Sequence, residues 1–279
     1  MRLFLLVVFS TLMTACISIS SDDDGVTNAE GQTVNAETLA LNGFWDGQLD
    51  QAGSLRILMY QGTIFGLDES RGYYGSINLD SSTQIANLDL TAYAITAADA
   101  TAGHYLADGS SVDYLMEGLV YTTASTSDTL VGDYDSDRGA GSFLLMDDAT
   151  WNNNAGVALV TGQWQAGDYS LYITSLGSRA SLKAISAASG GCTFDGFIEP
   201  VNQQYNLYNV TLTERKNCSD YNATNVPGYA TITAAGALEF FLFDTGSLYY
   251  MIYTAAVTEA ESTAATTTTT EDTATTAVE

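Results

Sequence analysis

Three cysteines and one histidine are the side chains of this 279-residue chain best suited to act as nucleophile, general base or soft metal ligand. Cys192 and Cys218 lie 26 residues apart (218 − 192), and two such cysteines form a disulfide by default in an exported chain. His104 lies in a predicted loop, and the chain has no Gly-x-Ser-x-Gly sequence, so we predict a surface histidine. One histidine and two paired cysteines leave no zinc site. We therefore predict no catalytic residue, no metal site and no cofactor.

Acidic side chains offer two further kinds of chemistry. Asp133, Asp135 and Asp137 alternate as they do at the start of an EF-hand loop. That loop requires glycine and glutamate at its sixth and twelfth places, which here are Arg138 and Leu144, so it is excluded. A looser calcium site and a plain polar hairpin both stay open. A carboxylate pair for glycoside hydrolysis also stays open, although the spacing singles out no pair.

The N-terminus has the features of an export signal. A positive start is followed by an apolar run of about 11 residues, shorter than the roughly 20 that span a bilayer. The run ends in Leu12-Met13-Thr14-Ala15-Cys16, which resembles the lipobox of bacterial lipoproteins. The resemblance implies cleavage after Ala15 and lipid on Cys16. Ile17, in place of aspartate, resembles the outer-membrane sorting pattern of enteric Gram-negative bacteria. An ordinary cleaved signal with a free cysteine is the alternative.

The charge balance excludes one class of partner. Acidic residues outnumber basic residues 33 to 8, and the formal net charge is -25 at pH 7. Nucleic-acid binding needs clustered Lys and Arg, so we predict no nucleic-acid partner. The same balance disfavours adsorption to anionic lipid headgroups. We interpret the charge as a device for solubility, with an acidic site for a basic partner as the alternative.

Two stretches of the chain follow one plan. Gly43-Phe44-Trp45 recurs as Gly162-Gln163-Trp164, 119 residues later (162 − 43). An aromatic-x-Gly-x-Ile sequence at 73–77 recurs at 194–198, 121 residues later (194 − 73). A nearly constant offset indicates a duplication, and a period near 120 residues predicts two modules, each with its own core.

The first module reads as antiparallel strands. From Arg71 to Asp80, apolar and polar residues alternate, which indicates a half-buried strand. Gly and Asp at 107–109 predict a turn, and no stretch has a helical period with caps.

The second module repeats this style. A change of phase between Tyr205 and Thr213 predicts a β-bulge. The runs 238–243 and 248–253 are apolar on both faces, so we expect them to be buried or to pack against the first module. Their tyrosines, Tyr249, Tyr250 and Tyr253, are candidates for an inter-module or partner surface.

The paired Gly-x-Trp sequences resemble the opening of lipocalin-like barrels. In that family an arginine on the last strand packs over the tryptophan, and neither final strand here carries one. The resemblance implies meander barrels. A small barrel is often filled by its own side chains, so we favour a packed interior over a ligand cavity.

The sequence thus predicts an all-β protein with two tandem antiparallel meander modules, each a barrel or sandwich of about eight strands. The predicted boundaries are a signal peptide at 1–15, a flexible tether at 16–40, modules at 41–150 and 158–254, a linker at 151–157 and a disordered tail at 255–279.

We expect a lipoprotein of the Gram-negative outer membrane, held by lipid on Cys16, that serves as a non-enzymatic structural or binding module of the envelope. Its expected partners are the membrane, through that lipid, and an envelope protein. A carrier of a small apolar ligand is the alternative, and a carboxylate-based hydrolase is less favoured.

Overall fold

The computed structural model describes residues 26–27, 31, 33–50, 52–99, 104–122, 128–186, 190–218 and 221–256. The predicted signal peptide, Cys16 and nearly all of the predicted tail lie outside these residues. Among the described residues, no helix has the length and apolar character needed to cross a bilayer.

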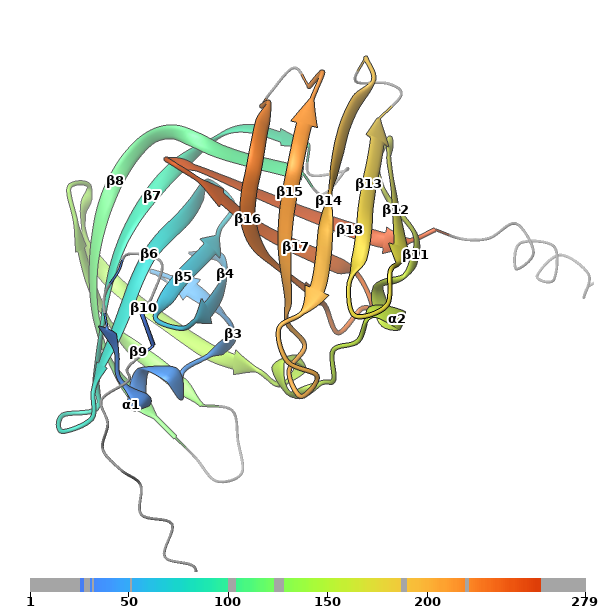
Figure 1. The fold of residues 1–279 in the computed structure, drawn as a ribbon. Helices are drawn as coiled ribbons and strands as arrows, with labels where there is room; N and C mark the ends of the chain where they lie inside the picture. The colour runs from blue at the N-terminus through green and yellow to red at the C-terminus, as the bar shows by residue number, and fades with distance from the viewer. Residues whose placement is uncertain are drawn as a thin grey trace, which may run out of the picture.

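Eight antiparallel strands close the first barrel (Figure 1). Each strand pairs with the next along the chain, and the last pairs with the first. Inward side chains alternate with outward ones and form one apolar core. The strands are β3 (Gly43–Leu49), β4 (Ala52–Tyr60), β5 (Thr63–Leu67), β6 (Arg71–Asp80), β7 (Ile85–Asp99), β8 (His104–Tyr121), β9 (Thr129–Ser136) and β10 (Gly139–Asp148).

The second barrel has the same order of pairing. Its last strand meets its first where Ala255 pairs with Trp164. The strands are β11 (Gly162–Ala166), β12 (Tyr169–Ser175), β13 (Ala180–Ser186), β14 (Cys192–Pro200), β15 (Tyr208–Lys216), β16 (Ala223–Ile232), β17 (Leu238–Asp244) and β18 (Ser247–Ala255). The predicted all-β class with two antiparallel meander modules is confirmed, and both modules are barrels.

The two barrels begin with the same local arrangement. A four-residue helix precedes each first strand: α1 (Ala36–Leu39) and α2 (Val157–Val160). The indole nitrogen of Trp45 donates to the carbonyl of Leu41 at 3.1 Å, and that of Trp164 donates to the carbonyl of Val160 at 2.8 Å. Each tryptophan is buried and satisfies its N–H four residues back along the chain, as a buried indole must.

Two glycines at equivalent positions also match. A Cβ on Gly75 would lie 2.0 Å from the carbonyl oxygen of Asp89, and one on Gly196 would lie 2.3 Å from that of Thr211. In each barrel the glycine therefore permits a close backbone approach by the next strand. These shared details support the prediction of two copies.

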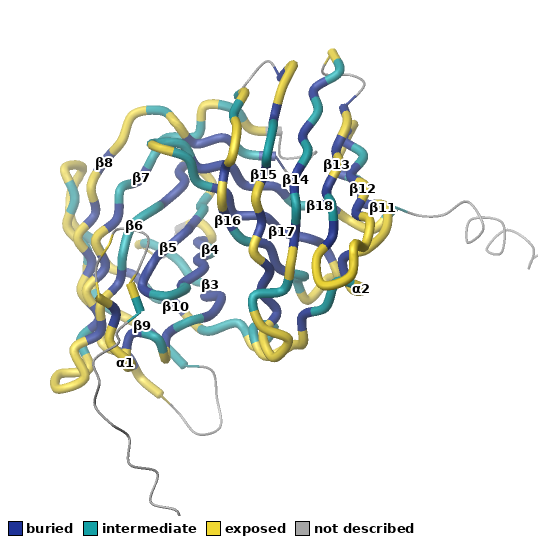
Figure 2. The backbone as a smooth tube through the Cα atoms, in the orientation of Figure 1, coloured by how far each residue is buried: buried dark blue, intermediate teal, exposed yellow. Residues whose placement is uncertain are grey.

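The barrels are joined by continuous backbone pairing. The first residues of β8, from His104 to Ala107, pair with β18, while its C-terminal half pairs with β9. Sixteen strands therefore form one sheet with two closed rings. The runs 238–243 and 248–253 became β17 and β18, and their mostly buried residues confirm the predicted burial (Figure 2).

A third apolar cluster, the inter-barrel core, fills the space between the outer faces of the two barrels. Phe44 of the first barrel stacks on Phe241 of the second, with ring centroids 6.2 Å apart. Trp151, in the predicted linker, lies in the 3-10 helix η1 (Ala149–Asn152) and stacks on Tyr205. The linker thus contributes to this core, and the two modules share apolar contacts in addition to their own cores.

Two local predictions were wrong, and a third was confirmed at a different residue. The turn predicted at 107–109 lies inside β8, because β8 continues from one barrel to the other. A β-bulge does lie in the predicted range, at Thr213, which has no partner on β14, whereas the phase change near Leu207 marks the start of β15. The predicted tether is partly structured: β1 (Val26–Thr27) pairs with β2 (Thr33–Val34), and Thr38 of α1 bonds to the backbone of Leu79.

Candidate functional site

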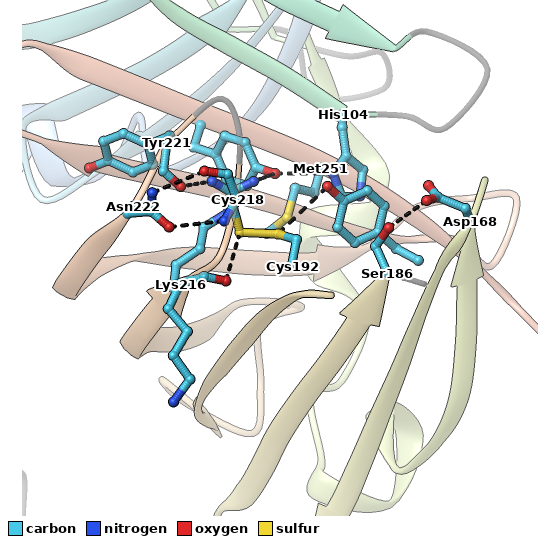
Figure 3. The surroundings of a disulfide bond; sticks show 12 residues. His104, Asp168, Ser186, Cys192, Lys216, Cys218, Tyr221, Asn222 and Met251 are labelled. Atoms are coloured by element: carbon cyan, nitrogen blue, oxygen red, sulfur yellow. Dashed lines mark hydrogen bonds between the residues drawn. A yellow bond between two sulfur atoms is a disulfide. The ribbon is translucent and has the colours of Figure 1, made fainter. Parts of the chain in front are cut away.

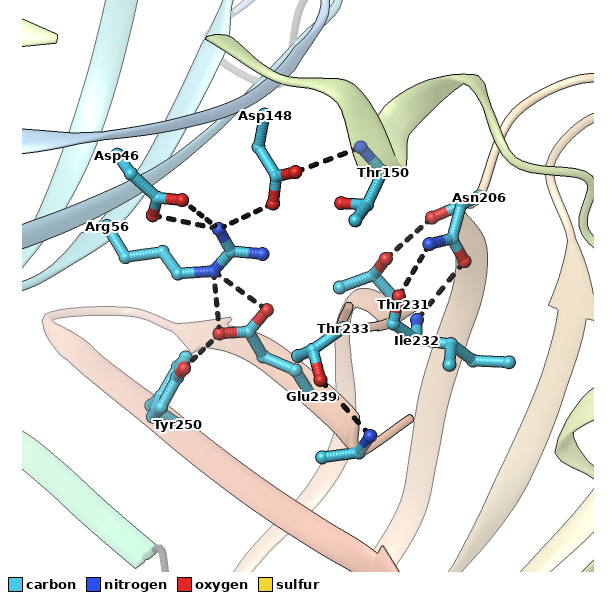
Figure 4. Close-up of polar contacts among 11 residues, drawn as sticks. Asp46, Arg56, Asp148, Thr150, Asn206, Thr231, Ile232, Thr233, Glu239 and Tyr250 are labelled. Carbon is cyan, nitrogen blue, oxygen red and sulfur yellow. Dashed lines mark hydrogen bonds and ion pairs between the residues drawn. The ribbon is translucent and has the colours of Figure 1, made fainter. Parts of the chain in front are cut away.

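The junction between the barrels contains a cluster of charged side chains around Arg56 (Figure 4). Arg56 Nη1 lies 2.8 Å from Asp46 Oδ1 and 3.2 Å from Asp148 Oδ2. Its Nε lies 2.9 Å from Glu239 Oε1. Asp46 and Asp148 belong to the first barrel and Glu239 to the second, so one guanidinium ties the two barrels together.

The strand register explains how these groups meet. Asp46 and Arg56 are direct partners on β3 and β4, so their side chains leave the same outer face of the first barrel. Glu239 lies on β17, where it is 1% exposed, and the Tyr250 hydroxyl on β18 donates a hydrogen bond to it. Sequence reasoning missed this cluster because Arg56 and Glu239 are 183 residues apart in the chain. The one available signal was a charged residue inside the apolar run of β17.

Burial raises the pKa of Glu239, while the positive charge of Arg56 and the hydrogen bond from Tyr250 oppose that rise. Burial alone would also raise the pKa of Asp148, but hydrogen bonds from Thr150 together with Arg56 lower it overall. Each carboxylate of the cluster has a partner, and Arg56 contacts all three. The cluster therefore links the two barrels through one guanidinium and three carboxylates.

A cleft of about 390 Å³ opens beside this cluster, lined by Arg56, Asp68, Glu69, Tyr105 and Tyr250 together with apolar side chains. Asp68 is already engaged, because its carboxylate accepts hydrogen bonds from the backbone of Arg71 and from the Tyr73 hydroxyl.

His104 is buried, so the prediction of a surface histidine was wrong. Figure 3 shows it among the residues that surround the disulfide. It begins β8 and enters the second barrel, where its ring stacks on Tyr169 with centroids 4.2 Å apart. Its Nδ1 lies 3.0 Å from the Tyr249 hydroxyl, which also accepts a hydrogen bond from buried Arg215 at 3.0 Å. His104 and Leu106 are buried, but the polar even-numbered residues Asp108 and Ser110 are exposed, so the alternation that starts at Val112 does not extend back to His104.

The disulfide between Cys192 and Cys218 is present. It joins the start of β14 to the residues that follow β15, and both cysteines are buried. The Tyr169 hydroxyl lies 3.8 Å from Cys192 Sγ, so the disulfide borders the cluster around His104.

The Asp133–Asp137 stretch forms the end of β9 and the turn into β10, which agrees with a polar hairpin. Within the described ranges, no three His, Cys, Asp or Glu side chains are grouped so that they could hold a metal ion.

Comparisons of the chain with protein-family models, with curated proteins and with solved structures each find no match.

Proposed function

We propose that this protein is a lipoprotein of the Gram-negative outer membrane, anchored through Cys16, that works by binding an envelope partner and not by catalysis. The observation that carries the proposal is the composition of the barrel interiors. Large apolar side chains, such as Trp45 and Tyr73 in the first barrel and Phe194 and Tyr253 in the second, pack together there. With the barrel interiors filled, the outer surface is the part of the protein left to bind a partner.

The alternatives draw less support. A carrier in a barrel lumen would need the space that these core side chains occupy. A carboxylate-based hydrolase would need one free carboxylate and one proton-donating carboxyl facing a cleft. Around Arg56 the three carboxylates are engaged, and the two barrels are held by them.

Fractionation of cells tests the anchor. Cys16→Ser should move the protein from the membrane fraction to the soluble fraction, because a lipid-free chain this acidic has no affinity for anionic headgroups. Retention of the variant in the membrane would refute the anchor.

Native mass spectrometry of the Cys16→Ser protein, purified from its host's periplasm, tests binding against carriage. A bare mass is the expected result. A small-molecule adduct that leaves on denaturation would instead indicate that the protein is a carrier.

A further inference from the structure

The outward face of β7, β8, β9 and β10 carries an apolar row across four strands. Ile85, Leu119, Val131 and Leu144 are successive cross-strand partners. Leu119 is 42% exposed and Val131 38% exposed. The inter-barrel core uses β3 to β7 and the start of β8, so this row lies on the wall turned away from the second barrel (Figure 1).

Acidic side chains lie beside the apolar row. Glu117 and Asp133 are direct cross-strand partners, two residues along their strands from Leu119 and Val131, and both are exposed. A further two residues along β8, Leu115 is 62% exposed and lies between its cross-strand partners Asp89 and Asp135. None of these four carboxylates takes part in an ion pair with a described Lys or Arg.

The facing carboxylates lower the stability of the isolated fold, because like charges placed directly opposite on neighbouring strands repel. The exposed parts of Leu119 and Val131 contribute nothing to that stability. A solubility device needs neither the pairing of Glu117 with Asp133 nor the adjoining apolar row.

The surface is also hollowed. A depression of about 660 Å³ is lined by residues that include Asn78, Asn87, Leu115, Glu117 and Asp133. We call this surface, with the apolar row and the four carboxylates, the acidic wall.

We propose that the acidic wall binds a basic amphipathic segment of another protein. Apolar residues of that segment would cover the row from Ile85 to Leu144, and its Lys or Arg side chains would meet Glu117 and Asp133. A second copy of this chain does not fit, because it has 8 basic residues and a net charge of -25. The proposal rests on the proposed function as a binding module and names the class of partner.

The dimensions of the row set the length of the segment. Four strands spaced about 4.8 Å apart span roughly 14 Å. A helix rises about 1.5 Å per residue, so roughly ten residues would cover the row. The acidic row lies about 7 Å away along the strands, within reach of a lysine on the flank of that helix.

The test uses a labelled peptide of about 14 residues with leucines at helical spacing and lysines along one flank. Its binding to the purified full chain carrying Cys16→Ser is followed by fluorescence anisotropy. The double variant Glu117→Gln/Asp133→Asn should bind about tenfold more weakly, because two charge contacts are lost. Leu119→Ser should also weaken binding several-fold, and 0.5 M salt should weaken binding to the parent.

The matched control is Glu199→Gln/Asp195→Asn, which removes one Glu and one Asp charge from the outer face of β14 in the second barrel. It should change the affinity less than twofold. Thermal melting checks the fold, and the Glu117/Asp133 variant should melt no lower than the parent because it removes facing like charges.

Equal affinities of the two double variants would overturn the proposal, as would equally tight binding of a scrambled peptide of the same composition. These outcomes are independent of the anchor, because every protein in the assay lacks Cys16. Failure of the proposal that the acidic wall binds a basic segment can therefore be told apart from failure of the lipoprotein proposal.

Discussion

Replacing Arg56 with methionine should sharply destabilise the protein, because it leaves the carboxylate of Glu239 buried without its charged partner. Glu239 is 1% exposed, and Arg56 Nε lies 2.9 and 3.0 Å from its two oxygens. Removing one member of a buried pair costs about 3–5 kcal/mol. Asp46 and Asp148 are more exposed and can be solvated, so Glu239 accounts for most of the loss. At roughly 2–4 °C per kcal/mol, the melting temperature should fall by about 10 °C.

The pH dependence separates a lost charge from lost packing. Burial already raises the pKa of Glu239, and without Arg56 the pKa rises further. The folded variant then binds a proton more tightly than the unfolded chain does, so its stability increases as pH falls. The deficit of Arg56→Met relative to the parent should therefore shrink between pH 7 and pH 5, measured by circular dichroism melts.

Two further variants make the test specific. Arg56→Met/Glu239→Leu removes both charges of this ion pair and should recover much of the loss. Arg179→Met removes an exposed arginine that lies over Phe197 and forms no ion pair with a described carboxylate, and should change stability by less than about 0.5 kcal/mol. An unchanged melting temperature for Arg56→Met, or an equal deficit at both pH values, would refute the role assigned to the buried pair.

Replacing Cys192 and Cys218 with serine should lower the free energy of unfolding by about 3 kcal/mol, because the bond closes a 26-residue loop; urea titrations that coincide with the parent would contradict this. Gly75→Ala should cost about 1–3 kcal/mol, because its Cβ would meet a backbone oxygen at 2.0 Å. Gly156→Ala, with open space around its Cβ, should melt like the parent, and equal melting of both alanine variants would refute the close approach. Burial raises the pKa of Tyr229 to about 12, so stability should be lost as pH rises from 10 through 12. The Tyr229→Phe variant should lose less stability than the parent over that range. If melts at pH 9 and pH 11.5 show the same loss for variant and parent, this tyrosine has no such role.

Local patterns predicted most of the secondary structure. The alternation from Arg71 to Asp80 became β6, because a half-buried strand imposes a period of two on its own sequence. The pairing of Cys192 with Cys218 followed from the cysteine count and from the expectation of export. His104 was misassigned because its strand crosses from one barrel to the other, and turn-forming residues at 107–109 hide that continuation.

The sequence by itself determined the all-β class, the two modules, the disulfide and the expectation of a lipid anchor on Cys16, because each depends on local patterns or on composition. Only the tertiary structure decided that both modules close into barrels, that β8 pairs with β18, and that Arg56 meets Glu239. The acidic wall likewise exists only once β7 to β10 are in register, since its rows run across the strands. Alternation places each side chain on the inner or the outer face of its barrel. The partner of each outward residue is set by closure and register, which no local stretch of sequence contains.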